Sequence, residues 1–198
     1  APACCRQPSD GMNVQSTSDR ARTAQKLVVE LLRSDLPEAR ATRRNEVDEW
    51  AAKLGVGRPR FGVRAQPQPD LSHPAIAVAL DACIHCTRCL RACRDAQAND
   101  VIGLALRGPQ AKIVFDIDDP MGASTCVGCG ECVQACPTGA LAPAGGAARE
   151  LPDASVDSVC PYCGVGCQVT YHVKDDRIAV VEGRDGPANR GRLCVKGR

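Results

Sequence analysis

Aromatic side chains are scarce in this sequence, which contains one Trp, two Tyr and two Phe among 198 residues. A chain of this length with so few aromatic rings has little material for one conventional hydrophobic core. It also lacks any apolar run close to the roughly 20 residues that span a membrane, and it lacks a signal-peptide pattern. We therefore expect small modules with no membrane span, and the cytoplasm is the default compartment.

An excess of charge is missing as well. The 25 Lys and Arg residues nearly balance 23 Asp and Glu residues, which leaves a formal net charge of +2. So small a charge does not indicate a nucleic-acid partner. The nearest basic group, Arg88, Arg91 and Arg94, is interleaved with cysteines. We expect these arginines to balance the charge of a bound cluster.

Cysteine, in contrast, is plentiful, and twelve of the 14 cysteines form three sets of four. Two sets share the spacing C-x2-C-x2-C-x3-C at an offset of 43 residues, and the third reads C-x2-C-x3-C with a distant fourth member. Such spacing is typical of 4Fe-4S binding, because each iron of the cube takes one thiolate. The sequence therefore predicts three 4Fe-4S clusters that together form an electron-transfer path. The three sets are Cys83, Cys86, Cys89 and Cys93; Cys126, Cys129, Cys132 and Cys136; and Cys160, Cys163, Cys167 and Cys194.

The first two sets are expected to exchange their last members. In two-cluster ferredoxins the fourth cysteine of each run ligates the other cluster, which ties both halves into one unit and brings the cubes close together. The predicted ligand sets are therefore Cys83, Cys86, Cys89 and Cys136 for one cluster, and Cys126, Cys129, Cys132 and Cys93 for its partner.

Disulfides and zinc are the alternatives. Many cysteines in a short chain can mark a secreted disulfide scaffold, but loops of two and three residues suit a shared metal better than separate bridges. Four thiolates also satisfy tetrahedral zinc, but zinc sites usually pair two C-x2-C hairpins across a longer spacer. Three cysteines in one short loop, present twice, favour the iron–sulfur cube over both.

Two helices are predicted upstream of the cysteines. Residues 18 to 36, with Ser18 or Asp19 as a cap and Pro37 as a stop, carry one apolar face that we expect to pack on neighbouring elements. A shorter helix should begin after Asn45 and end at Gly55. The apolar positions of the two helices are Ala24, Leu27, Val28, Leu31 and Leu32, and then Val47, Trp50, Ala51 and Leu54.

The predicted fold class is α+β, built from small metal-nucleated modules. A strand is expected over Lys112 to Ile117, and a hairpin over Gln168 to Val173 and Ile178 to Glu182. The segment 157–198 should hold the third cluster beside that hairpin. The predicted division is 1–58 for the end of an upstream domain with a helical segment, 59–72 for a linker, 73–143 for a double-cluster ferredoxin-like domain, 144–156 for a second linker, and 157–198 for the last 4Fe-4S module.

At this point the residues carry a family resemblance. The stretches HPAIAVALDACIHCTRCLRACRDAQANDVIG, STCVGCGECVQACPTGAL, CPYCGVGCQVTYHV and RLCVKGR resemble the amino-terminal part of the catalytic subunit of cytosolic NAD-dependent formate dehydrogenases. The last two stretches alone are shared across molybdopterin oxidoreductases. In combination with the double run they indicate formate dehydrogenases and their complex-I-like and hydrogenase relatives.

The resemblance implies an oxidoreductase in which formate is oxidised at molybdenum or tungsten held by two molybdopterin guanine dinucleotides. The cluster on Cys160, Cys163, Cys167 and Cys194 would accept the electrons, and Lys196 would relay them between pterin and cluster. The double-cluster unit would pass them towards a flavin-containing iron–sulfur subunit that reduces NAD. The active site would lie beyond Arg198, in the remainder of the same subunit, so the expected partners are that remainder and the NAD-reducing subunits. The rival interpretations are a complex-I-like or hydrogenase-associated segment and, from another class, a zinc-binding interaction module.

Upstream, the resemblance implies that Cys4 is the remnant ligand of a 2Fe-2S domain, whereas Cys5 has no matching role. Many relatives carry a further cluster on H-x3-C-x2-C-x5-C after the first helix, but Leu36 to Val56 contains neither Cys nor His. Because the chain begins at Ala1 without a start methionine and stops at Arg198 just after the last cysteine motif, we expect a fragment of something longer.

The three histidines differ in position. His73 and His172 lie outside the cysteine loops, so they are expected to be surface or packing residues. His85 lies inside a loop, where it either donates a hydrogen bond to a cluster or acts as a spacer. Several glycines inside the loops are expected to let the backbone approach a cube or to make a tight turn. They are Gly128, Gly130, Gly164 and Gly166.

Overall fold

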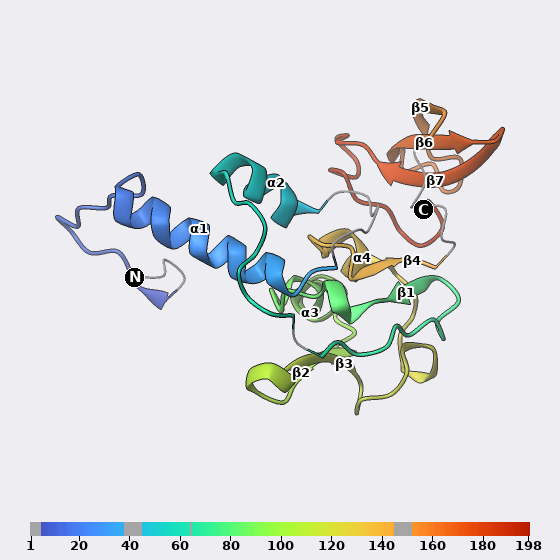
Figure 1. The fold of residues 1–198 in the computed structure, drawn as a ribbon. Coiled ribbons are helices and arrows are strands. Elements are labelled where there is room, and N and C mark those ends of the chain that lie inside the picture. The colour runs from blue at the N-terminus through green and yellow to red at the C-terminus, as the bar shows by residue number, and fades with distance from the viewer. Residues whose placement is uncertain (1–4, 38–44, 64, 145–151) are drawn as a thin grey trace.

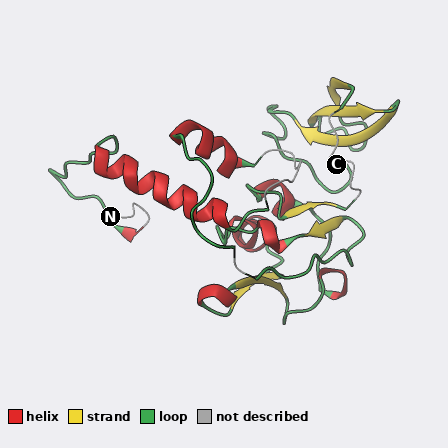
Figure 2. Ribbon diagram, viewed as in Figure 1, coloured by secondary structure: helices red, strands yellow, loops and turns green. Residues whose placement is uncertain are grey.

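The computed structural model describes residues 5–37, 45–63, 65–144 and 152–198. A pair of helices and a three-stranded sheet lie on either side of a central unit made of short helices and two small sheets (Figure 1). Helices and strands both contribute, as an α+β fold requires (Figure 2). Within the described residues, no helix is both long and apolar enough to cross a bilayer.

Helix α1, Asp19–Ser34, begins where the sequence predicts a cap. The Ser18 hydroxyl accepts a hydrogen bond from the Ala21 amide at 3.3 Å, which satisfies one of the free amides of the first turn. Asp19 adds a negative charge where the helix dipole is positive, and Arg33 adds a positive charge in the last turn. The predicted position of this helix is confirmed.

The predicted packing of that helix is wrong. Leu27, Val28 and Leu31 are 39%, 56% and 50% exposed, whereas the buried residues of α1 are Glu30 and Ser34. Charged groups on this polar side make the tertiary contacts, so the side expected to face solvent is the side that packs. The apolar stripe is left at the surface of the described residues.

One ion pair and a set of arginine hydrogen bonds to backbone carbonyl oxygens hold that polar side. Both carboxylate oxygens of Glu30 accept hydrogen bonds at 2.7 Å from the guanidinium of Arg60, and Glu30 also accepts from the Arg60 amide. Arg33 donates to the carbonyl oxygens of Val56 and Gly57 at 3.3 and 3.0 Å. The segment after the second helix is thereby fastened to α1.

Helix α2, Glu46–Leu54, has the predicted ends. The Asn45 side chain accepts from the Val47 amide at 3.0 Å, and Gly55 takes the left-handed conformation (φ 65°) that closes many helices. The Glu46 amide donates to the Pro137 carbonyl oxygen at 2.9 Å, and its carboxylate pairs with Arg88. Both cysteine runs are therefore linked to this helix.

The central unit has a repeated plan. In each half a short helix follows the cysteine loop, and each two-stranded sheet is antiparallel. The elements are β1 (Ile76–Val78) paired with β4 (Leu141–Pro143), β2 (Ile102–Ala105) paired with β3 (Lys112–Phe115), α3 (Arg88–Arg91) with a π-helical turn over Ala92–Ala96, and α4 (Glu131–Ala135). Short 3-10 turns cover Leu80–Ala82, Gly108–Gln110 and Met121–Ala123.

Cysteine side chains form part of the core of this unit. Cys89, Cys93 and Cys132 are buried in one cluster with Ile76 and Phe115. This arrangement agrees with the scarcity of aromatic residues, since thiols and any group that they bind occupy space that rings fill elsewhere. The predicted strand over Lys112 to Ile117 is observed, but it ends at Phe115.

Both predicted linkers need correction. In the linker predicted over 59–72, Asp70 bridges Val78, and the carboxylate of Asp70 accepts from the Met121 amide at 2.7 Å. The end of that segment therefore belongs to the central unit. In the linker predicted over 144–156, the residues 145–151 lie outside the described structure. The residues from Ala154 onward are not a linker, because they begin strand β5, Ala154–Val159.

The last sheet has the order β5–β6–β7, with all neighbours antiparallel. Strands β6 (Gln168–Lys174) and β7 (Arg177–Gly183) form the predicted hairpin, which is confirmed. Its turn places Asp175 and Asp176 at positive φ, a conformation that Asp tolerates better than most residues.

Candidate iron–sulfur centres

One pocket collects thiols from both cysteine runs. Cys83, Cys86 and Cys89 reach it from the first loop, and Cys136 reaches it from the end of α4. The rest of its lining is mainly apolar and includes Leu80 and Leu141. Four thiols around a mainly apolar space fit a 4Fe-4S cube, in which each iron takes one thiolate. The structure thus brings the exchanged set together, while ligation itself stays a prediction.

The electrostatics of the first set agree with this grouping. Burial raises the pKa of Cys89 to about 12, and the neighbouring thiols of Cys136, Cys83 and Cys86 act in the same direction. A thiol with so high a pKa keeps its proton at neutral pH. Binding of a cluster must therefore displace that proton, because the thiolate is the ligand.

The second set shows the mirror-image grouping. Burial raises the pKa of Cys132 to about 12, with contributions of the same sign from Cys126, Cys89, Cys129 and Cys93. Cys93 comes from the first run, so this set is also crossed. Cys89 influences Cys132 although each belongs to a different predicted set, which means that the two sites adjoin. Adjacent clusters are the requirement for rapid electron exchange between them.

The two loops have the same pattern of hydrogen bonds as well as the same cysteine spacing. The His85 amide donates to Cys83 Sγ at 3.4 Å, and the Gly128 amide donates to Cys126 Sγ at the same distance. Amides that point at sulfur stabilise the negative charge of a ligating thiolate and tune the cluster potential. Each loop is therefore shaped to stabilise the negative charge of a cluster that its thiolates ligate.

The backbone explains which residue types the loops use. Gly128 and Gly130 have φ of 66° and 76°, and the equivalent residues of the first loop, His85 and Thr87, have φ of 53° and 59°. Both loops need a positive φ at these two positions. The second loop has glycine there, as expected, but the first has residues that carry a Cβ. Sequence reasoning missed this asymmetry. The offset of 43 residues was the signal that could have revealed it.

In the third set, contacts link the loop of Cys160 and Cys167 to the loop of Cys194. The Cys160 amide donates to the Cys167 carbonyl oxygen at 2.8 Å, and a Cβ built on Gly197 would lie 3.4 Å from Cys160 Sγ. The Cys194 loop therefore lies against Cys160. The amides of Gly197 and Lys196 lower the pKa of Cys194, and the charge of Lys196 acts in the same direction. Cys163 is exposed at the surface of this module.

A junction joins this module to the central unit. The Gln134 side chain accepts from the Leu193 amide at 2.9 Å and donates to the Leu193 carbonyl oxygen at 3.2 Å. The Arg198 guanidinium donates to the carbonyl oxygens of Gly130 and Leu193 at 2.8 and 2.7 Å. Sequence reasoning assigned no role to Gln134 or Arg198, because no motif marks a contact between two modules.

The remaining predicted residues divide as follows. Cys4 lies outside the described residues, and Cys5 is exposed. His73 is a buried packing residue whose Nδ1 accepts from the Ala75 amide. His172 lies on β6 within hydrogen-bond distance of Ser155 and Glu182. Lys196 is exposed beside Cys194.

Among the described residues, no group of three or more His, Cys, Asp or Glu side chains converges closely enough to hold a single metal ion.

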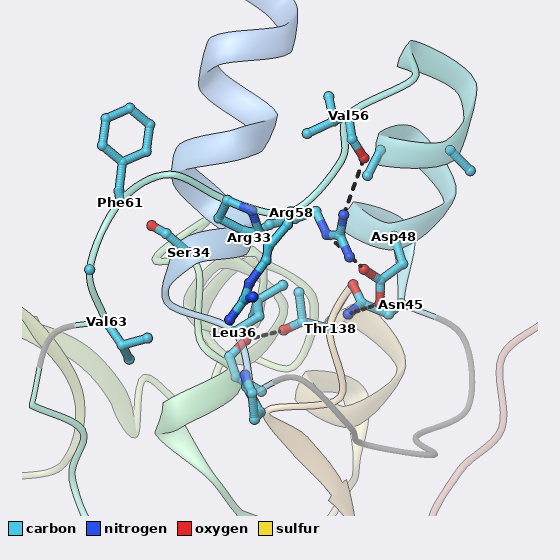
Figure 3. Close-up of a pocket in the computed structure, with 16 residues that line it drawn as sticks. Arg33, Ser34, Leu36, Asn45, Asp48, Val56, Arg58, Phe61, Val63 and Thr138 are labelled. Atoms are coloured by element: carbon cyan, nitrogen blue, oxygen red, sulfur yellow. Dashed lines mark hydrogen bonds and ion pairs between the residues drawn. The ribbon is translucent and has the colours of Figure 1, made fainter.

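A cavity of about 730 Å³ lies between α1, α2 and the loop that follows them (Figure 3). Arg33 extends across it towards α2 and pairs with Asp48 at 3.3 Å. Its described lining includes no cysteine or histidine. These lining residues therefore offer no ligand of the kind that an iron–sulfur cluster takes.

Comparison with known families agrees with this geometry. Residues 82–140 match the 4Fe-4S dicluster domain, and residues 153–198 match the molybdopterin oxidoreductase Fe4S4 domain. The chain carries both iron–sulfur domains. The first match contains both cysteine runs, and the second contains the third set. The expectation of 4Fe-4S clusters is thereby confirmed at the level of these domains. These two matches support an electron-transfer iron–sulfur segment similar to those of molybdopterin oxidoreductase-family subunits.

The curated relatives are proteins with different names. The chain is 30% identical over 99% of its length to the alpha subunit of the NADPH-Fe(3+) oxidoreductase of Geobacter sulfurreducens. It is 29% identical over 100% of its length to a subunit of the NADH-quinone oxidoreductase of Rhizobium meliloti. It is 26% identical over 78% of its length to a Staphylococcus haemolyticus protein named "Putative formate dehydrogenase". The chain spans 24%, 24% and 19% of these relatives.

A solved structure of similar fold is the NAD+-reducing [NiFe]-hydrogenase in the H2-reduced state, with a TM-score of 0.63. The sequence identity is 21%, and the alignment covers 71% of this chain and 62% of that one. At this identity the likeness concerns the fold alone. It agrees with a fold of short helices and small sheets.

Proposed function

We propose that this segment carries electrons within a molybdopterin-dependent formate dehydrogenase. Electrons from formate oxidation at molybdenum or tungsten enter at the cluster on Cys160, Cys163, Cys167 and Cys194. They then cross the double-cluster unit towards a flavin-containing subunit that reduces NAD. The observation that carries this proposal is the position of Lys196, an exposed cation beside Cys194 in the module that matches the molybdopterin oxidoreductase Fe4S4 domain.

Each group in the segment has a defined task. A bound 4Fe-4S cluster takes up and releases one electron at a time. The cysteine thiolates hold the irons, and the amides of His85 and Gly128 donate to thiolate sulfur, which offsets negative charge. Apolar side chains such as Leu80 and Leu141 exclude water from the first site. Lys196 extends from the last loop, where it would meet the pterin.

The second candidate function is that of a complex-I-like or hydrogenase-associated subunit. The resemblance to the Rhizobium meliloti NADH-quinone oxidoreductase subunit and to the hydrogenase fold favours it. In that case the same wiring carries electrons in a subunit that does not oxidise formate. The two functions share every cysteine assignment and differ only in the electron donor.

The deciding experiment uses the natural protein, purified without oxygen. Three cubes predict about twelve iron atoms and about twelve acid-labile sulfides per chain. Formate dehydrogenase activity further predicts molybdenum or tungsten with pterin, and cluster reduction on addition of formate. Iron and sulfide without pterin, with clusters reduced by NADH and unaffected by formate, would support the complex-I-like function. Stoichiometric zinc without charge-transfer absorption would refute both.

A further inference from the structure

The contact between the last module and the double-cluster unit is concentrated on one short surface. Gln134 on α4 makes two hydrogen bonds to the backbone of Leu193, whose side chain is 4% exposed. Arg198 then donates to Leu193 and to Gly130, which lies between Cys129 and Cys132. The loop that carries Cys194 is therefore held directly against the loop of the second cysteine run.

Arg198 places a positive charge inside this contact. Its guanidinium is so close to Gly130 that a Cβ on that glycine would lie 2.6 Å from the guanidinium carbon, so only glycine permits the approach. Arg198 Nε is buried and has no hydrogen-bond partner among the described residues. Burial lowers the pKa of Arg198, and Glu131 and the thiols of Cys132, Cys129 and Cys194 oppose that shift. The cation thus faces ligand candidates of two different clusters.

We propose that Arg198 is the cation that couples these two clusters. It raises the reduction potential of the cluster on Cys126, Cys129, Cys132 and Cys93, and it holds the Cys194 loop at electron-transfer distance from that cluster. This inference rests on the proposed electron-transfer function and adds an order to it. Electrons leave the third cluster for the second-run cluster first, and the cluster on Cys83, Cys86, Cys89 and Cys136 receives them afterwards.

The physical reason is the charge of the cluster. Four thiolates make a ligated 4Fe-4S cube anionic, and each added electron makes it more so. A buried cation nearby stabilises the reduced form more than the oxidised form, because low-dielectric surroundings screen the attraction weakly. The negative charge of Glu131 on α4 acts against this stabilisation of the reduced cluster, and the Glu131 side chain is 12% exposed. Without Arg198, the buried positive charge that offsets Glu131 at this junction would be lost.

Arg192 provides a matched control. It carries the same guanidinium, lies in the same segment and approaches Glu131 at 3.8 Å, but its side chain is 67% exposed. Solvent and salt screen such a charge. If proximity in the chain were enough, Arg192 and Arg198 would act alike. If burial at the junction matters, only Arg198 should change the potential.

The test is a redox titration, followed by electron paramagnetic resonance, of the cluster-loaded natural protein and three variants. In Arg198→Gln, reduction of the second-run cluster should become about tenfold less favourable, which is about 59 mV for one electron. Arg198→Lys should retain most of the parent potential because it retains the charge. Arg192→Gln and the first-run cluster in all variants should stay at parent values. The signals are assigned beforehand from single cysteine variants.

Several results would overturn the inference. An unchanged second-run potential in Arg198→Gln, with iron and sulfide content equal to the parent, would remove the electrostatic role. An equal shift of both clusters of the double unit would remove the predicted order. If Arg198→Gln loses iron, Arg198→Lys is the deciding variant. A fully loaded lysine variant in which reduction of the second-run cluster is tenfold less favourable would contradict a role for the charge. None of these titrations uses formate, so failure of the formate assay would overturn the proposed function alone.

Discussion

Cys89 and Cys136 line one pocket although they belong to different cysteine runs. The chain between them forms β2, β3 and the whole second loop. A shared site thus closes a long loop, and a bound cluster would act as a cross-link between the two halves of the central unit. The thiol of Cys93, from the first run, likewise raises the pKa of Cys132 in the second run, so the second predicted site is also shared between the runs.

This crossing predicts the outcome of two serine substitutions. Cys93→Ser should damage the cluster of the second run, and Cys136→Ser should damage the cluster of the first, because each removes a ligand from the opposite loop. Paramagnetic resonance of the reduced protein would distinguish the two signals, and iron content would count the loss. If each substitution disturbed only the cluster of its own run, the exchanged assignment would be refuted. Cys5→Ser, at an exposed position, serves as the control and should leave both signals intact.

Local signals in the sequence were sufficient for the elements that depend on few residues. The cap at Asn45 and the left-handed Gly55 define α2 through their own backbone preferences, so its ends could be predicted. The hairpin of β6 and β7 follows from alternation around Asp175 and Asp176. Cysteine spacing indicated iron–sulfur domains because cluster geometry tolerates few spacings.

Contacts between distant segments could not be predicted in this way. The apolar stripe of α1 indicated burial, but Glu30 packs instead, because its partner Arg60 lies beyond α2. The sequence predicts the first half of strand β5 as the end of a polar linker, whereas the structure pairs the whole strand with β6. The junction of Gln134 with Leu193 depends on the placement of two modules, for which a single sequence contains no periodic signal.

The unequal loops predict opposite effects at equivalent positions. Thr87 has a φ of 59°, and this left-handed conformation costs an L-residue about 1–2 kcal/mol. Glycine avoids that strain, but it lowers stability by about 0.5–1 kcal/mol because the unfolded chain gains conformational entropy. Thr87→Gly should therefore be neutral or stabilising by up to about 1.5 kcal/mol. Gly130→Thr should destabilise by about 2–4 kcal/mol, because it adds the same strain and collides with Arg198.

Denaturant titrations of the cluster-loaded protein, followed by cluster absorbance and circular dichroism, would measure both effects. A destabilised Thr87→Gly with intact iron content would mean that the threonine side chain has a task of its own. A tolerated Gly130→Thr would mean that the Arg198 side chain moves away from the added Cβ at little cost.

Asp70 should stabilise the central unit as an anion. Burial raises its pKa, but hydrogen bonds from Ser72 and the Met121 amide outweigh that effect, so the net pKa is lowered. A lowered pKa in the folded state means that the stabilisation is complete above the unfolded pKa and is lost only as the pH falls through the lower folded value. Asp70→Asn should therefore cost about 1–2 kcal/mol of unfolding free energy.

That cost should be constant over neutral and mildly alkaline pH, since Asp70 stays ionised there. Chemical unfolding at several such pH values measures it, with Asp10→Asn as an exposed control. A cost that grew steadily with pH would show that another group titrates in this contact, and no cost at all would mean that Asp70 does not fasten the segment before β1.

Lys196 provides the test closest to the electron donor. Under the proposed function, Lys196→Ala in the natural protein should leave every cluster assembled, because lysine is not an iron ligand, and it should slow the passage of electrons from the pterin to the cluster beside Cys194. Formate-driven cluster reduction in rapid-mixing experiments should fall by about 10- to 100-fold, the range for loss of a residue that supports a metal centre. Reduction by dithionite, and the content of iron, molybdenum or tungsten, and pterin, should match the parent, since binding and electron transfer are separable. Lys174→Ala, which removes a half-buried lysine at the end of β6 that pairs with Asp153, should behave like the parent in both assays. Equal formate-driven rates for Lys196→Ala and the parent would show that Lys196 is a solvated charge after the last ligand.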